Sequence, residues 1–285
     1  MENHNYRAQM SISTCPMHAG VTATQDNSCS TCGMDLKPSQ QENTDQYQVQ
    51  LTTLPEIIEA GYPVRLTFSI KKNKELVQLD ISHEMKIHVM VVSKDLNWFQ
   101  RIYPVQQKDG TYAVTQTFHN GGEYLFFACF KPLGLEKVLH KLEIEVQGYY
   151  MTSREVSSNK PIAYTDDYKV TLENAEDFKT SKTQTLKIAI EKCEKKLEQS
   201  DLEQYLGTHA HIVLINKIDK DFLHIHPVSH GRYPIYAETK IEKAGKYKMW
   251  VQFKIHGKLH TADFNISVYP ERESERKVHF HQHQL

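Results

Sequence analysis

The residues with the clearest capacity for chemistry lie between Cys15 and Met34, in two short knuckles. The first knuckle is CPMH, ending at His18, and the second is CSTCG, ending at Gly33. Three thiols and one imidazole make a closed tetrahedral ligand set, which usually holds a structural Zn²⁺ and leaves no open position for catalysis. The predicted metal ligands are Cys15, His18, Cys29 and Cys32.

Two methionines accompany these ligands, Met17 inside the first knuckle and Met34 directly after the second. A thioether contributes little to Zn²⁺ binding, but together with thiolates it favours Cu(I) or another soft ion such as Ag(I). The alternative is that both side chains only fill a small core. The residues therefore predict one soft or borderline ion, Cu(I)/Ag(I) or Zn²⁺, with Met17 and Met34 as additional candidate ligands.

The sequence CPMH followed by CSTCGMDL resembles the heavy-metal-binding domain found near the N termini of copper and silver efflux adaptors and some copper-transporting ATPases. The resemblance covers only about residues 13–38. Ala19 and Ser30 stand where the family usually has proline, which affects local rigidity more than ligation. The resemblance implies copper or silver handling and a metal efflux or metallochaperone partner. A segment this short is expected to fold only around its metal.

Length and composition place the rest of the chain among ordinary globular proteins. Its 285 residues predict about two domains, and 34 basic against 35 acidic residues give no reason to expect a nucleic acid or an anionic membrane as partner. Neither a secretory signal nor a transmembrane segment is evident, so the chain as given is predicted to be cytoplasmic, or periplasmic or exported if its N terminus was trimmed. Cys129 and Cys193 are predicted to be buried free thiols in strands.

Short runs rich in valine, tyrosine and phenylalanine follow the knuckles, separated by turn signals such as Lys108-Asp109-Gly110. The second half of the chain repeats the first: His88 aligns with His211, Gly122 with Gly245, and IYP at 102–104 with IHP at 225–227. A period of about 120 residues indicates a duplicated domain rather than a solenoid. The strands expected in the first copy are Val64–Ile70, Ile87–Ser93, Tyr112–Phe118, Tyr124–Phe130 and Lys141–Val146.

About seven alternating strands in about 100 residues are typical of an immunoglobulin-like antiparallel sandwich. The two copies also resemble the YtkA-like domains of bacterial metal-associated proteins, through segments such as DLNWFQRIYP and KAGKYKMWVQF. The predicted fold is all-β: a zinc-ribbon-like knuckle and two tandem sandwiches. The predicted parts are a disordered N terminus (1–12), the knuckle domain (13–38), a linker (39–46), the first sandwich (47–148), a linker (149–163), the second sandwich (164–270) and a His-rich tail (271–285). A helix within Asn174–Leu206 competes locally, but the repeat favours strand and loop there.

Four histidines of the second copy form a second candidate site. His209 and His211 are two residues apart, as are His224 and His226, so each pair lies on one face of a strand. If Ile212, Leu214, Leu223 and Ile225 face the core, a hairpin brings the pairs together on the opposite face, with Cβ atoms about 5 Å apart. Such a group suits one Cu(II), Zn²⁺ or Ni²⁺ ion on an exposed sheet face.

The alternative for this group is a set of surface histidines on a solvated face. The first copy has Arg101 and Tyr103 in place of His224 and His226, but retains a histidine at the position of His211. Residues shared by both copies are more often structural, which weakens His211 as a ligand. His140 and His260, which also align, are predicted to be core-edge histidines satisfied by backbone partners.

The sequence lacks a phosphate loop, a nucleophile elbow and an HExxH helix, so catalysis is not expected. The sixteen histidines include three alternating ones in the tail, at 279, 281 and 283, which are typical of weak metal capture. The predicted function is a non-catalytic heavy-metal-binding protein that buffers, senses or hands over copper, silver or zinc. The alternative is a protein-interaction module in which the knuckle is only a structural zinc staple.

Overall fold

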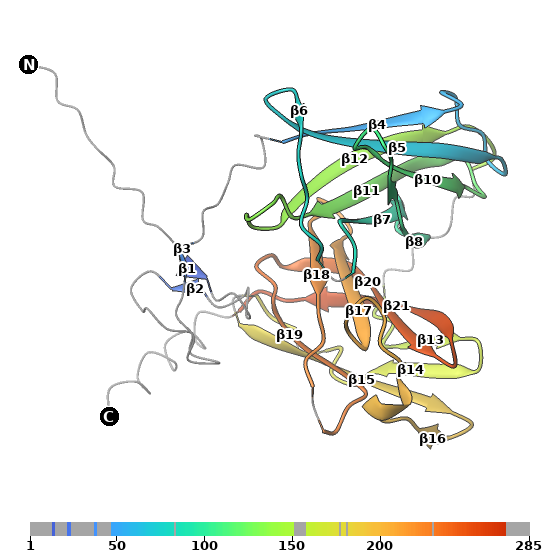
Figure 1. Ribbon diagram of the computed structural model, residues 1–285. Helices are drawn as coiled ribbons and strands as arrows, with labels where there is room; N and C mark the ends of the chain where they lie inside the picture. Colours follow the sequence, from blue (N-terminus) through green and yellow to red (C-terminus); the bar gives the residue numbers. More distant parts are fainter. Residues whose placement is uncertain are drawn as a thin grey trace, which may run out of the picture.

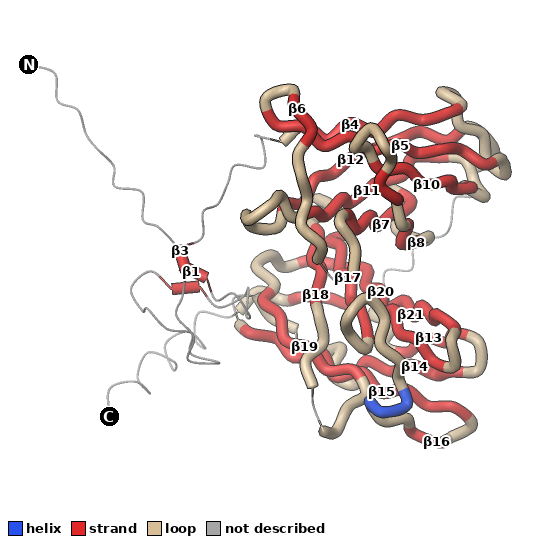
Figure 2. Tube along the Cα trace, viewed as in Figure 1, coloured by secondary structure: helices blue, strands red, loops and turns tan. Residues whose placement is uncertain are grey.

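The computed structural model describes residues 13–14, 22–23, 37–38, 47–82, 84–150, 158–176, 178–180, 182–229 and 231–271. These segments consist of strands and connecting loops, with a single 3-10 turn at Gln199–Asp201 (Figure 2). Within them no helix is long and apolar enough to cross a membrane. The protein is all-β, as the sequence predicted.

The knuckle region contributes three short strands that pair in the order β2-β1-β3. They are β1 (Ser13–Thr14), β2 (Thr22–Ala23) and β3 (Lys37–Pro38). The candidate ligands Cys15, Met17, His18, Cys29, Cys32 and Met34 lie outside the described residues.

The first sandwich has two antiparallel sheets, one in the order β4-β5-β10-β9 with β6 on β5, the other in the order β12-β11-β7-β8 (Figure 1). Alternate residues of β5 are buried, so one of its faces meets the core. Phe68, Phe118 and Phe126 are fully buried there, and each contributes about 1.5–3 kcal/mol through burial. The strands are β4 (Gln48–Leu54), β5 (Pro63–Lys72), β6 (Glu75–Leu76), β7 (Ile87–Ser93), β8 (Phe99–Ile102), β9 (Val105–Gln106), β10 (Tyr112–Thr117), β11 (Gly122–Phe130) and β12 (Val138–Val146).

The second sandwich repeats this plan, with one sheet in the order β13-β14-β15-β16 with β19 on β15, and the other in the order β18-β17-β20-β21. Its core includes Phe178, Tyr247, Phe253 and Phe264. The strands are β13 (Ile162–Thr165), β14 (Tyr168–Leu172), β15 (Thr183–Lys192), β16 (Lys195–Lys196), β17 (Ala210–Asn216), β18 (Phe222–Ile225), β19 (Ile235–Lys240), β20 (Gly245–Ile255) and β21 (Lys258–Val268).

Within Asn174–Leu206, for which a helix competed, the chain forms the β15-β16 hairpin in agreement with the repeat, and the short 3-10 turn follows it. Cys193 and Glu194 occupy the turn of the hairpin with φ of 48° and 63°, much as Asn73 and Lys74 do between β5 and β6 with 53° and 69°. The prediction of a buried Cys193 in a strand is therefore wrong, because this thiol is exposed at the turn. Cys129 lies in β11 and is partly buried, and burial raises the pKa of its thiol to about 12.

The two sandwiches pack face to face through their β7-β11 and β17-β20 sheets (Figure 1). Phe99 stacks on Trp250 with ring centroids 5.0 Å apart, and Phe127 stacks on Phe222 at 4.4 Å. The repeat makes Phe99 equivalent to Phe222 and Phe127 equivalent to Trp250, so the two stacks are related by an approximate two-fold axis. The interface thus has the isologous character of a homodimer contact within one chain. Its other apolar members are Met90, Val92, Leu96, Leu125, Cys129, Val213 and Ile215.

Candidate metal centre

The second candidate site is built on the β17-β18 hairpin, whose register follows from its apolar residues. Ile212 pairs with Ile225 and Leu214 with Leu223, and Ile212, Leu214 and Ile225 lie in the core of the second sandwich. Val213 pairs with His224 on the opposite face. This is the register that the sequence predicted, because any slip by one residue would turn the apolar side chains away from the core.

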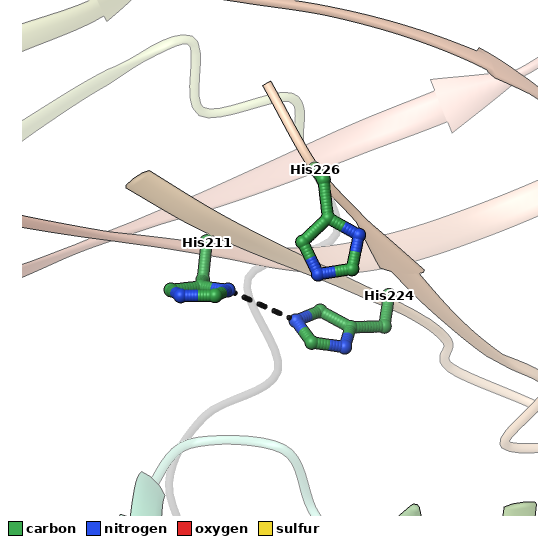
Figure 3. Close-up of side chains that lie close together, drawn as sticks. All are labelled: His211, His224 and His226. Carbon is green, nitrogen blue, oxygen red and sulfur yellow. Dashed lines mark hydrogen bonds between the residues drawn. The ribbon is translucent and has the colours of Figure 1, made fainter. Parts of the chain in front are cut away.

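Three of the four candidate histidines meet on that opposite face. Figure 3 shows the rings of His211, His224 and His226 turned toward one another. One ring nitrogen from each lies within 4.8 Å of the other two, and His211 Nδ1 is 3.3 Å from His224 Nε2. Two nitrogens bound to one tetrahedral ion at about 2.0–2.1 Å are themselves about 3.3–3.4 Å apart. In the histidine trio, His211, His224 and His226, the first two already have a nitrogen pair at this spacing, and the three rings together lie close enough to converge on one ion. His209, just before β17, is not part of this group.

The expectation of an exposed, solvated face is wrong, because the first sandwich covers it. His211 is 1% exposed, and His224 and His226 are partly buried. The alternation of side chains along a strand shows which residues point away from the core of their own sheet. It does not show whether another surface packs against them. The trio consequently lies at a domain interface, where ligand sites are common.

The hydrogen bonding of His211 defines which of its nitrogens faces the other rings. Its Nε2 lies 2.9 Å from the carbonyl oxygen of Tyr205, which can only accept, so Nε2 carries the proton. In the neutral ring Nδ1 is then a lone-pair donor directed at His224. Metal-ligating histidines commonly donate their second nitrogen to a carbonyl in this way. His88 makes the equivalent bond to the carbonyl oxygen of Ser82 in the first sandwich, at 2.6 Å, so this contact is shared by both copies.

The first sandwich contributes Arg101 to the site, at the position equivalent to His224. Its Nη2 is 3.3 Å from His224 Nε2, a contact between residues 123 positions apart. Because each is the counterpart of the other in the repeat, this contact lies on the approximate two-fold axis. Nearby, the hydroxyls of Tyr103 and Tyr205 hydrogen-bond across the interface. Burial, followed by this hydrogen bond, raises the pKa of Tyr205.

The metal-free protein is expected to lose stability in mild acid because of this site. Burial, with smaller contributions from His226, Arg101, His211 and His88, holds the pKa of His224 well below its usual value of 6.5. The folded protein then binds fewer protons here than the unfolded chain, so the free energy of unfolding decreases as the pH falls below about 6.5. Thermal melts from about pH 8 to about pH 5 measure this decrease, and His224→Gln should flatten it. Equal pH profiles of stability for the wild-type and His224→Gln proteins would show that His224 is not the source of the decrease.

Two further histidines, His140 and His260, and a cleft beside β17 lie apart from the trio. His260 is buried, but its Nδ1 lies 2.8 Å from the Asp166 carboxylate, so the predicted backbone partner is replaced by a side chain. Burial lowers the pKa of His140. A cleft of about 790 Å³ near the far end of β17 is lined by residues that include Asn97, Lys217 and Lys248, and no member of the trio lines it. The tail histidines lie outside the described residues.

Comparison with known proteins identifies the class of the N-terminal region first. Residues 14–39 match the heavy metal binding domain, so the chain carries a domain of that class in front of its two sandwiches. The chain belongs to the family described as Domain of unknown function (DUF8832), which matches it twice, over residues 42–148 and 163–270. The two matches confirm the duplication that the sequence predicted.

No curated protein sequence matches the chain. Among solved structures, the fibronectin(III)-like modules of Clostridium thermocellum CbhA are similar at 11% identity and a TM-score of 0.23, over 79% of this chain and 94% of that one. The strand pairing of this chain itself defines the two sandwiches.

Proposed function

We propose that the protein binds Cu(I) or Ag(I) at two places, the knuckle and the histidine trio, and buffers the ion or passes it to a partner. The observation that carries the trio as the second site is the convergence of three ring nitrogens within 4.8 Å at the interface. The protein would act without catalysis, as a carrier whose cargo is the metal.

The knuckle supports a soft ion through its ligand types. Thiolates with thioethers beside them favour Cu(I) and Ag(I), and the matched heavy metal binding domain supplies both. The resemblance of this motif to those of copper and silver efflux adaptors, and of the sandwiches to YtkA-like domains, is consistent with metal handling.

Charge supports a monovalent ion at the trio. Neutral imidazoles add no negative charge, and the group contains no carboxylate. The guanidinium of Arg101 lies against His224. A unit charge about 4 Å away costs on the order of 4 kcal/mol at an effective dielectric constant of 20, and a divalent ion doubles that cost. The buried guanidinium thus disfavours Zn²⁺ more than Cu(I) or Ag(I).

Competition titrations of the full chain with Ag(I) and Zn²⁺ test this proposal. Cys15, Cys29 and Cys32 are changed to serine, and the tail residues His279, His281 and His283 to asparagine. In this background Ag(I) should still bind at about one site, and His224→Ala should weaken that binding at least about tenfold because one of three ligands is lost. His119→Ala, which removes an exposed histidine of the first sandwich, is the matched control and should change nothing.

The same titrations distinguish the zinc-staple alternative. A metal carrier should lose its preference for Ag(I) over Zn²⁺ at the knuckle in Met17→Leu with Met34→Leu. If the knuckle is only a structural zinc staple, it should bind one Zn²⁺ in both the wild-type protein and the double variant. Ag(I) should not replace that Zn²⁺. Ag(I) binding that His224→Ala leaves unchanged would show that the trio is not a metal site.

A further inference from the structure

Arg101 is a buried cation for which the described residues supply no carboxylate partner. It is 3% exposed, and its Nε and Nη1 atoms make no hydrogen bond to any described residue. Burial lowers the pKa of the guanidinium and is the largest influence on it. Buried charges are normally paired or fully hydrogen-bonded, because an uncompensated one costs several kcal/mol.

Among the described residues, this guanidinium contacts a nitrogen that metal binding would use. Nη2 lies 3.3 Å from His224 Nε2, which is also the atom 3.3 Å from His211 Nδ1. A metal ion that takes the lone pair of His224 Nε2 removes the acceptor from Arg101. It also adds a second positive charge beside the first, so the bare ion and the guanidinium oppose each other.

The trio leaves room in the coordination sphere for a ligand that resolves this conflict. Three imidazoles fill three positions of a tetrahedral ion and leave a fourth open. Among the described residues, the candidate ligands that converge here are the three histidines. A ligand from solution can therefore take the fourth position. An anion at that position would neutralise charge on the metal and accept hydrogen bonds from the guanidinium, whose donors form a planar fork.

We propose that the metal ion at the trio is bound together with a small monovalent anion, of the halide or carboxylate class, which occupies the fourth coordination position and is held by Arg101. This inference rests on the proposed metal site. The two copies of the repeat differ at the position that lies on the approximate two-fold axis, which is Arg101 in the first copy and His224 in the second. The first copy therefore supplies the anion-binding group, and the second copy supplies the metal ligands. Metal and anion therefore bind cooperatively, each raising the affinity for the other by the same factor.

Azide binding to the Cu(II)-loaded protein tests the proposal, because an azide-to-copper charge-transfer band reports an anion on the metal. The full chain is used with Cys15, Cys29 and Cys32 changed to serine and His279, His281 and His283 changed to asparagine, and only the signal abolished by His224→Ala is counted. Arg101→Leu should weaken azide binding by about tenfold, within the usual range of coupling between two ligands. Arg101→Lys should show an intermediate loss, because it keeps the charge but lacks the fork. Arg65→Leu, at an exposed arginine bonded to Gln107, should leave azide binding unchanged.

The outcomes separate this inference from the metal site on which it rests. Equal azide affinity in wild-type and Arg101→Leu proteins, with Cu(II) still bound to the trio, would overturn the role of Arg101 and leave the metal site intact. Absence of binding that depends on His224 for both Cu(II) and Ag(I) would overturn both. Circular dichroism of each variant verifies that the sandwiches remain folded.

Discussion

Trp250→Ala is expected to destabilise the pairing of the two sandwiches by about 3–5 kcal/mol, the range found for removing a large buried aromatic side chain. Trp250 is 3% exposed and stacks on Phe99 with an interplanar angle of 19°. It lies in the apolar cluster between the sandwiches, not in either core. The substitution should therefore separate the sandwiches before it unfolds them. Small-angle scattering measures the separation, and denaturant unfolding measures the loss of stability.

The same substitution should weaken metal binding at the trio, because Trp250 holds together the two surfaces between which the trio lies. Tyr164→Ala is the matched control, since this aromatic side chain is 73% exposed on the second sandwich and should be neutral. Unchanged scattering and an unchanged unfolding midpoint in Trp250→Ala would show that the interface is not maintained by this cluster.

Cys29→Ser is expected to remove about one metal equivalent per chain, because a tetrahedral site that loses one of three thiolates loses most of its affinity. The measurement is mass-spectrometric metal analysis of untagged protein purified without chelator. Copper or silver that disappears in Cys29→Ser supports a carrier, whereas one tight zinc that does not exchange for Cu(I) supports a staple.

Cys193→Ser provides the control for this second prediction. It removes an exposed thiol in a hairpin turn that belongs to no candidate site, so the metal content should be that of the wild-type protein. A full metal complement in Cys29→Ser would contradict the assignment of the knuckle ligands.

The strands and the histidine hairpin were predictable because their residues carry a local pattern. β7 spans Ile87–Ser93 as expected, and the β17-β18 register follows from the need to bury Ile212, Leu214 and Ile225. The repeat also resolved the segment around Cys193, where a charged sequence with helical spacing is a hairpin. In that segment the pairing between strands outweighs the local propensity for a helix.

The contact between the sandwiches was not predictable from the periodicity of the sequence. The burial of the trio and the role of Arg101 depend on that contact, so they were not predictable either. One signal was present: β7 and β17 are buried along nearly their whole length, and their sequences IHVMVVS and AHIVLIN are apolar on both faces. An antiparallel strand that faces water usually alternates apolar and polar residues. Two such strands at equivalent positions indicate that the outer faces are covered, but not by what.

Anomalous diffraction from crystals of the full chain grown with Ag(I) determines whether the trio between the sandwiches is a metal site. We expect a peak bonded to ring nitrogens of His211, His224 and His226, at about 2.0–2.5 Å from each. Silver located at the knuckle or elsewhere, with the three rings at the separations described here and no peak between them, would contradict this expectation.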